Sequence, residues 1–198
     1  KDPRWTGNVK KYSISSDGDV LDAGGNIAIE PTTGYFKTGA ESYWGNIADG
    51  PVVKKSGTSS QFTNDRTVYT IAGDATANNI TLNTTDNKIG LSNNVITDLQ
   101  FGLDIAEFAD QAALDVARQR LISWIIGIDV DNDDNDASST DANNYMADPL
   151  HSRPIVVTYD GDNTDPDNVV LEDTMFATTN EGAFHAIDTS NGQEIFAF

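Results

Sequence analysis

Aspartate and asparagine dominate the polar residues of this chain, and both residue types favour turns over helices. Aspartate supplies 25 of the 31 acidic residues, and 18 asparagines, 20 threonines and 16 glycines accompany it in a chain of 198 residues. The side chains of aspartate and asparagine bond to nearby backbone and tolerate turn geometry, whereas threonine favours the pleated surface of a sheet. The sequence therefore predicts a mainly β protein in which helix is scarce.

The charge balance excludes two classes of partner. The formal net charge is −19, and the 12 Lys and Arg residues are scattered along the chain. Recognition of a nucleic-acid backbone needs clustered Lys and Arg, so no nucleic-acid partner is expected. No apolar run approaches the roughly 18 to 20 residues that a membrane-spanning helix requires. The chain is therefore expected to be globular and acidic, without a membrane span.

Short runs with strand character recur along the chain, separated by turn residues. Residues 66–71 alternate polar with larger apolar side chains, as a half-buried strand does, and residues 79–82 are their expected partner. The last part of the chain predicts a closing hairpin and a final strand. The remaining candidates are residues 9–14 and 19–21, which form an expected hairpin, and residues 27–29, 43–44, 52–53, 154–159, 169–171, 175–178, 183–187 and 195–198.

One segment departs from the β pattern. Apolar residues recur at spacings of two to four between Leu103 and Ile125, in a stretch without Pro. Asp110 suits an N-terminal turn, and the positive charges lie nearer the C-terminal end, which agrees with the helix dipole. The sequence predicts a helix over about 110–126, ended by Gly127 and packed against a sheet.

The composition changes sharply after this helix. Residues 129–173 contain thirteen acidic residues and a single basic one, Arg153. At the start of this segment Asp129, Asp131 and Asp133 alternate, as the first three ligands of an EF-hand-type calcium loop do. Calcium takes six to eight oxygen ligands, and carboxylates gathered in a tight turn provide them. Repulsion among the aspartates would otherwise disorder the loop, so ion binding and loop order should be coupled.

This loop departs from the EF-hand pattern at two positions. Asp134 stands at the usual Gly position, Thr140 stands at the usual Glu position, and Asp141 follows one residue late. Without that Gly and a bidentate Glu, the expected affinity lies in the weak range of about 10⁻⁴ to 10⁻³ M. A solvated acidic loop without an ion is the alternative interpretation.

The residues that could support catalysis form no recognisable set. His151 and Ser152 are adjacent, and adjacent residues of a strand point to opposite faces. No Gly-x-Ser-x-Gly elbow occurs, and His185 is the only other imidazole. We therefore expect a structural role for His151 and a protein that is not an enzyme.

The two ends of the chain share a pattern of strand, Gly-containing turn and strand. Residues 7–20 show it near the N-terminus and residues 182–195 show it near the C-terminus. A β-propeller blade contributes such a hairpin, and blades recur about every 40 to 45 residues. On this reading residues 1–198 form one β-propeller domain, or a fragment of one, with roughly three to four blades that the helix and the acidic loop interrupt.

Five segments form an ordered series that spans nearly the whole chain: residues 5–12, 65–70, 121–127, 148–157 and 179–188. The most specific parts are Asp-Pro-Leu-His-Ser at 148–152 and Asn-Glu-Gly-Ala-Phe-His-Ala at 180–186. In this order the segments resemble the C-terminal β-propeller domain of the PilY/PilC family, the type IV pilus tip-associated adhesins and biogenesis factors.

The resemblance implies a fold, a place and a set of partners. The fold would be a modified propeller of the seven-bladed type, so further chain or another subunit would complete the ring. The protein would be secreted and extracellular, at the pilus tip or cell surface, and would contact minor pilins and host or abiotic surfaces. It would act in pilus biogenesis, in the balance of extension and retraction, in adhesion and in twitching motility.

The resemblance also implies which residues bind calcium. These are Asp129, Asp131, Asp133 and Asn135, while Ala137 stands where the family has a later acidic ligand. Two other functions remain open on the sequence. Quinoprotein dehydrogenases are propellers that bind pyrroloquinoline quinone with calcium, and a structural extracellular filament subunit could use its acidity for solubility alone.

Overall fold

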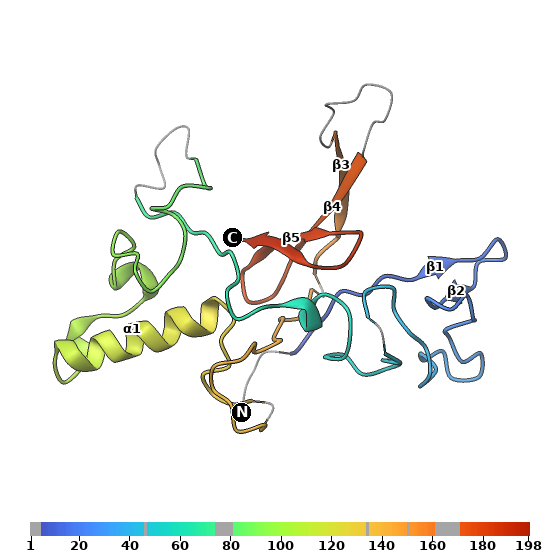
Figure 1. The fold of residues 1–198 in the computed structure, drawn as a ribbon, viewed down its shortest axis with the longest axis horizontal. Coiled ribbons are helices and arrows are strands. Elements are labelled where there is room, and N and C mark those ends of the chain that lie inside the picture. The colour runs from blue at the N-terminus through green and yellow to red at the C-terminus, as the bar shows by residue number, and fades with distance from the viewer. Residues whose placement is uncertain (1–4, 46, 74–80, 134, 150, 161–170) are drawn as a thin grey trace. The chain divides into compact units, whose positions relative to one another are not determined.

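The computed structural model describes residues 5–45, 47–73, 81–133, 135–149, 151–160 and 171–198. The protein is mainly β, with two antiparallel sheets and one α-helix, as the sequence predicts (Figure 1). It consists of two compact units, one formed by Lys1–Phe62 with Asn144–Ile195 and the other by Thr63–Asn143 with Phe196–Phe198. In the described part of the chain, no helix has the length and apolar character needed to cross a membrane.

The larger sheet lies in the C-terminal part of the chain and has the order β3-β4-β5-β6. Its strands are β3 (Ile155–Asp160), β4 (Leu171–Thr178), β5 (Phe184–Asp188) and β6 (Glu194–Ala197). The expected closing hairpin and final strand are confirmed by β4, β5 and β6. The predicted strand at 154–159 is confirmed by β3, and the part of the predicted strand 169–171 before Leu171 lies outside the described residues.

The turn between β5 and β6 depends on a glycine. Gly192 has a φ of 81°, and a Cβ there would meet the Trp44 ring at 2.6 Å. Trp44 belongs to a buried cluster with Met175 and Ile187, and its indole Nε1 donates to the Thr189 carbonyl at 3.0 Å. The glycine therefore lets the turn lie directly on a core tryptophan.

The N-terminal hairpin is shorter than predicted. Its strands are β1 (Ser13–Ile14) and β2 (Val20–Leu21), with Ser13 paired to Leu21. The prediction that the first strand starts at residue 9 is wrong, because the backbone there bonds to two other segments. The Val9 carbonyl accepts from Thr58 N–H, and the Lys11 carbonyl accepts from Tyr43 N–H, both at 2.9 Å.

The other N-terminal strand candidates form isolated bridges or turns. Ile27 bridges Leu21, and Ile29 bridges Phe36, without extension into a ladder. Residues 43–44 and 52–53 do not form strands. Trp44 is buried in the core without being part of a strand, whereas Val52 and Val53 are exposed.

The expected partner of residues 66–71 is wrong. Val68 bridges Ala197 in parallel and Tyr69 bridges Lys88, whereas residues 81 and 82 are in no strand and residues 79 and 80 lie outside the described part. The alternation of residues 66–71 still marks a half-buried segment, as predicted, because the Val68 side chain is buried. It packs in a core cluster of the unit formed by Thr63–Asn143 and Phe196–Phe198, together with Ile89, Ile96, Ile122 and Ala197.

The helix α1 (Gln111–Ile125) confirms the prediction of a helix over about 110–126. The Asp110 side chain caps it by accepting from Ala113 N–H at 2.9 Å, which satisfies one of the free amides of the first turn. Leu114 and Ile122 face the interior. The described residues also form 3₁₀ turns at Ser59–Gln61, Leu99–Phe101 and Ile105–Glu107.

Arg118 of α1 fixes the preceding loop to the helix. Its guanidinium donates to Asp98 Oδ1 at 2.8 Å and to the Asn93 and Ile96 carbonyls at 2.9 and 2.8 Å. The same group lies 4.9 Å from the centre of the Phe101 ring. A single side chain thus satisfies several acceptors of a segment that lacks regular structure.

Candidate metal centre

The acidic loop begins at a sharp reversal of the chain after α1. Gly127 has a φ of 99°, in the region that favours glycine. A Cβ at this position would lie 2.3 Å from the backbone oxygen of Thr63. The residue therefore ends the helix, as predicted, and also allows two backbone segments to approach closely.

Backbone hydrogen bonds close both ends of the loop formed by residues 129–141. Ile128 and Ala142 form an antiparallel bridge. Asp129 N–H donates to the Asp141 carbonyl at 2.9 Å, and Asn143 N–H donates to the Gly127 carbonyl at 2.8 Å. The first and last residues of the acidic loop are consequently held side by side.

Asp129 is the buried carboxylate of this loop. Only 2% of its surface is exposed. Its two carboxylate oxygens lie 3.0 and 2.9 Å from the backbone nitrogen of Asp133, which donates to them. Among the described residues no Lys or Arg pairs with this carboxylate, and its hydrogen-bond donor is the Asp133 N–H. A buried anion in that condition favours binding of a cation.

The other three predicted ligands do not converge on Asp129. The Asp131 carboxylate pairs with the Arg120 guanidinium of α1. Asp133 and Asn135 are exposed, and Asn135 has a φ of 60° with its Nδ2 donating to the Asp133 carbonyl at 3.4 Å. Within the described ranges, three or more Asp, Glu or His side chains do not gather at metal-binding distance. The structure brings together the Asp129 carboxylate and the Asp133 backbone.

Two side-chain oxygens of the loop are buried without a hydrogen bond. They are Asn132 Oδ1 and Asp141 Oδ1. Both residues bond to Asp129 through the backbone, because Asn132 N–H donates to the Asp129 carbonyl at 3.2 Å and Asp141 accepts from Asp129 N–H. Buried oxygens normally have a donor or a cation as partner. A hydrogen-bond donor or an oxygen-seeking cation such as calcium would supply that partner.

The alternation of acidic residues could not identify these two oxygens. Asn132 lies between two aspartates of the alternating set, and its φ of 51° turns the chain at that residue. Asp141 is one residue past the position of an EF-hand Glu. The tolerance of asparagine for left-handed backbone was the available indication that the chain turns at residue 132.

The two histidines take part in separate hydrogen bonds. His151 is exposed, with Nδ1 3.3 Å from Asn180 Oδ1, while Ser152 Oγ accepts from Thr178 N–H at 3.0 Å. His185 is buried, with Nδ1 2.7 Å from Glu194 Oε1 and Nε2 3.2 Å from Thr179 Oγ1. Both ring nitrogens of His185 are thus occupied by protein groups.

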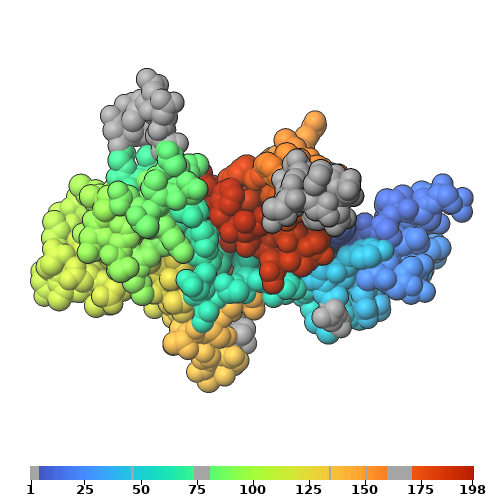
Figure 2. All heavy atoms as spheres, turned by 45° about the horizontal axis from the view of Figure 1, so that its top comes forward, coloured from blue at the N-terminus to red at the C-terminus, as the bar shows by residue number. Residues whose placement is uncertain are grey.

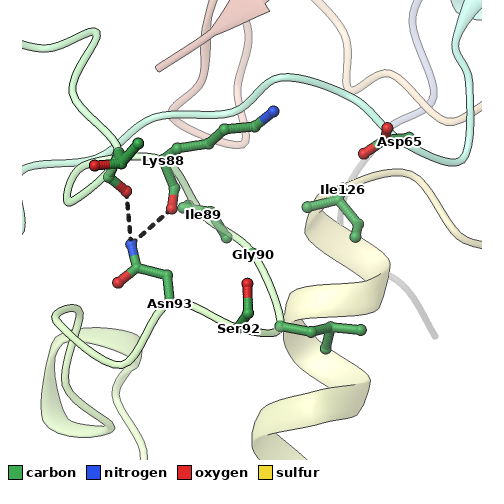
Figure 3. Close-up of a pocket in the computed structure, with 9 residues that line it drawn as sticks. Asp65, Lys88, Ile89, Gly90, Ser92, Asn93 and Ile126 are labelled. Atoms are coloured by element: carbon green, nitrogen blue, oxygen red, sulfur yellow. Dashed lines mark hydrogen bonds between the residues drawn. The ribbon is translucent and has the colours of Figure 1, made fainter.

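A groove of ≈ 460 Å³, which no sequence motif predicts, lies on the unit that carries the acidic loop (Figure 3). Asn93 supports one wall, because its Nδ2 donates to the Asp86 and Lys88 carbonyls at 2.9 and 2.8 Å. Figure 3 shows the Lys88 side chain extending in the direction of Asp65, above the apolar Ile126. None of the acidic-loop residues lines this groove.

Comparison of the chain with protein-family models, with curated proteins and with solved structures finds no match. The functional interpretation therefore depends on the residues of this chain.

Proposed function

We propose that this protein binds calcium through the acidic loop of residues 129–141 and functions as a tip-associated protein of a type IV pilus. The observation that carries the calcium proposal is a pair of buried side-chain oxygens without hydrogen-bond partners, Asn132 Oδ1 and Asp141 Oδ1. The backbones of these two residues are hydrogen-bonded to the backbone of the buried Asp129. Each side-chain oxygen would cost free energy on burial unless a donor or cation satisfied it.

The proposed ligands come from the sequence pattern and from the geometry together. Asp129, Asn132 and Asp141 supply buried oxygens, and Asp131, Asp133 and Asn135 supply exposed oxygens from the same turn. A bound calcium ion would offset the mutual repulsion of the loop carboxylates and hold the turn in one conformation. Asp131 would exchange its bond to Arg120 for the ion, at a small cost because that pair is largely exposed.

The pilus setting of the proposal comes from the resemblance to the PilY/PilC family. On that basis the protein is extracellular, contacts minor pilins and external surfaces, and acts in pilus biogenesis, adhesion and twitching motility. The coarse fold supports the proposal, because a four-stranded antiparallel sheet such as β3-β4-β5-β6 is the unit of a propeller blade. Further chain or another subunit would supply the remaining blades.

The proposed protein is a binding protein and not an enzyme. His151 and Ser152 bond to different partners, so in this structure the serine hydroxyl is not activated by the adjacent imidazole. Both nitrogens of His185 are bonded to protein groups in the interior.

A thermal unfolding experiment tests the calcium proposal. The midpoint of the intact chain should rise with calcium concentration and fall with chelator, because an ion that binds only the folded state stabilises it. The variant with Asp129→Ala and Asp131→Ala should lose this dependence. The matched control changes two exposed aspartates of the β1–β2 turn, Asp17→Ala with Asp19→Ala, and should keep it. An equal calcium effect in both double variants would contradict the assignment.

A further inference from the structure

We propose that the outer edge of β3 is a docking site for a basic, extended segment of another protein, which adds a strand to the sheet. Strand β3 ends the sheet order β3-β4-β5-β6 and pairs with β4 alone. In the described part of the chain, no backbone group bonds to the other side of β3. The edge therefore presents free amides and carbonyls to a partner.

The opposite end of the sheet is covered. Ala197 of β6 donates from its N–H to the Thr67 carbonyl and accepts from Tyr69 N–H, both at 2.9 Å. Backbone bonds therefore cover the β6 edge of the sheet, whereas the described residues form none with the outer edge of β3.

Most of the devices that protect an open edge are absent from β3, although Pro154 directly precedes the strand and Asp160 ends it. Natural edges use Lys, Pro, a bulge or a very short strand to prevent pairing. Strand β3 has six residues, Ile-Val-Val-Thr-Tyr-Asp, and pairs with β4 in continuous register from Ile155 with Phe176 to Asp160 with Leu171. Ile155, Val156 and Tyr159 are 63%, 56% and 46% exposed. A regular strand rich in β-branched residues, exposed in this way, is suited to pairing.

The hairpin formed by β3 and β4 also extends away from the rest of its sheet. Figure 1 shows these two strands continuing beyond β5, and Figure 2 shows the orange surface of β3 projecting beside the red strands.

The acidic residues next to β3 indicate which kind of segment could bind at this edge. Neither β3 nor β4 contains Lys or Arg. Glu172 and Asp173 of β4 are exposed next to β3, paired with Tyr159 and Thr158 in the ladder. A second copy of a chain with net charge −19 would bring like charges together. A segment with Lys or Arg at alternate positions would instead complement this surface.

A groove beside β3 offers a place for an apolar side chain of the incoming strand. Its volume is ≈ 350 Å³, and Trp44, Val156 and Met175 form apolar parts of its lining. Two lysines also line it, but their ammonium groups are engaged, Lys10 by Asp49 at 2.7 Å and Lys11 by the Thr189 carbonyl at 2.9 Å. Strand addition takes its affinity from main-chain hydrogen bonds and its specificity from such pockets for alternate side chains.

The test uses synthetic peptides and isothermal titration calorimetry on the intact chain. The probe is an eight-residue peptide in which lysine alternates with valine and threonine. The first control is the same peptide methylated on alternate backbone nitrogens, which keeps the charge and removes the ladder donors. The second control replaces each lysine by glutamate. The probe should bind, with protection of the β3 amides from hydrogen exchange, and both controls should bind at least tenfold more weakly.

Two variants locate the binding surface. Tyr159→Lys puts a natural protecting charge on the edge and should weaken the probe at least tenfold. Val116→Lys, on the exposed face of α1, adds the same charge elsewhere and should leave binding unchanged. Equal binding of the methylated peptide, or an equal effect of the two lysines, would show mere charge attraction and overturn the proposal. Protection of the β3 amides in the free chain, together with a dimer in sedimentation, would assign the edge to a second copy and also overturn it.

Discussion

Buried polar atoms that lack partners are the most informative features at the scale of single residues. Tyr12 is one example, because its hydroxyl is buried without a hydrogen bond and lies near two buried carboxylates, Asp49 and Asp22. Such a group lowers the stability of the folded state unless a hydrogen-bond partner or a bound ion satisfies it. In the acidic loop the proposed ion would be that partner. The buried Tyr12 hydroxyl instead affects how the stability of the protein depends on pH.

Burial, reinforced by Asp49 and Asp22, raises the pKa of Tyr12 to about 12. The unfolded chain ionises this phenol near its ordinary pKa of about 10. Since the folded state holds the proton more tightly, the free energy of unfolding should fall as pH rises from about 10 to about 12. The variant Tyr12→Phe should lose this part of the pH dependence and be no less stable at neutral pH. Chemical denaturation at several pH values measures both, and an unchanged slope in the variant would contradict the assignment.

The pair of Lys10 and Asp49 gives a second prediction. The ammonium lies 2.7 Å from Asp49 Oδ2, and the aspartate side chain is fully buried. Lys10→Met leaves that carboxylate without its counter-ion and should destabilise the protein by about 3 kcal/mol or more. The control Lys54→Met removes an exposed ammonium and should change stability by less than about 0.5 kcal/mol. Urea denaturation compares them, and equal losses would show that the pair has no special role.

At the scale of elements, the junction between α1 and the acidic loop depends on Gly127. Gly127→Ala would put a Cβ at 2.3 Å from the Thr63 carbonyl oxygen and would also require a non-glycine residue at φ 99°. The control is Gly102→Ala, which has a similar φ of 74° but open space around the new Cβ. The control should cost about 1 kcal/mol and Gly127→Ala clearly more, on the order of 3 kcal/mol. Similar losses in the two variants would mean that the close approach is relieved easily.

The elements that the sequence predicts best are those with local determinants. The helix α1 follows from its own periodicity, its Asp110 cap and its terminal Gly127. The C-terminal strands follow from runs of β-branched and aromatic residues. The partner of Tyr69 is Lys88, and Val68 meets Ala197, more than a hundred residues away. No local pattern encodes such a choice, because it depends on which buried clusters form.

The same limit applies to the candidate site. The alternation of Asp129, Asp131 and Asp133 directs attention to the loop proposed here as the site, but it assumes that one ion binds every second side chain. In the structure Asp131 pairs with Arg120, and the buried unpaired oxygens belong to Asn132 and Asp141. The bridge between Ile128 and Ala142, which joins the two ends of the loop, is likewise a contact between residues distant in the sequence.

At the scale of the whole molecule, the acidic composition has two roles in this account. Under the proposals made above, the net charge of −19 would favour basic partners over a second copy at the β3 edge. It would also make the acidic loop dependent on a cation, because five aspartates fall within residues 129–136. The pilus-tip role and the complete propeller are proposals that extend this account beyond the 198 residues.

Direct measurement of calcium binding by calorimetry tests the central claim. Titration of the intact chain should show saturable binding of calcium, with magnesium much weaker, because the loop offers many flexible oxygens and no rigid octahedral cage. Asp129→Asn and Asp141→Asn should each weaken binding at least tenfold, while Asp17→Asn in the β1–β2 turn should not. Absence of saturable binding up to about 10 mM calcium, or equal binding by all three variants, would contradict the claim that this loop is a calcium site.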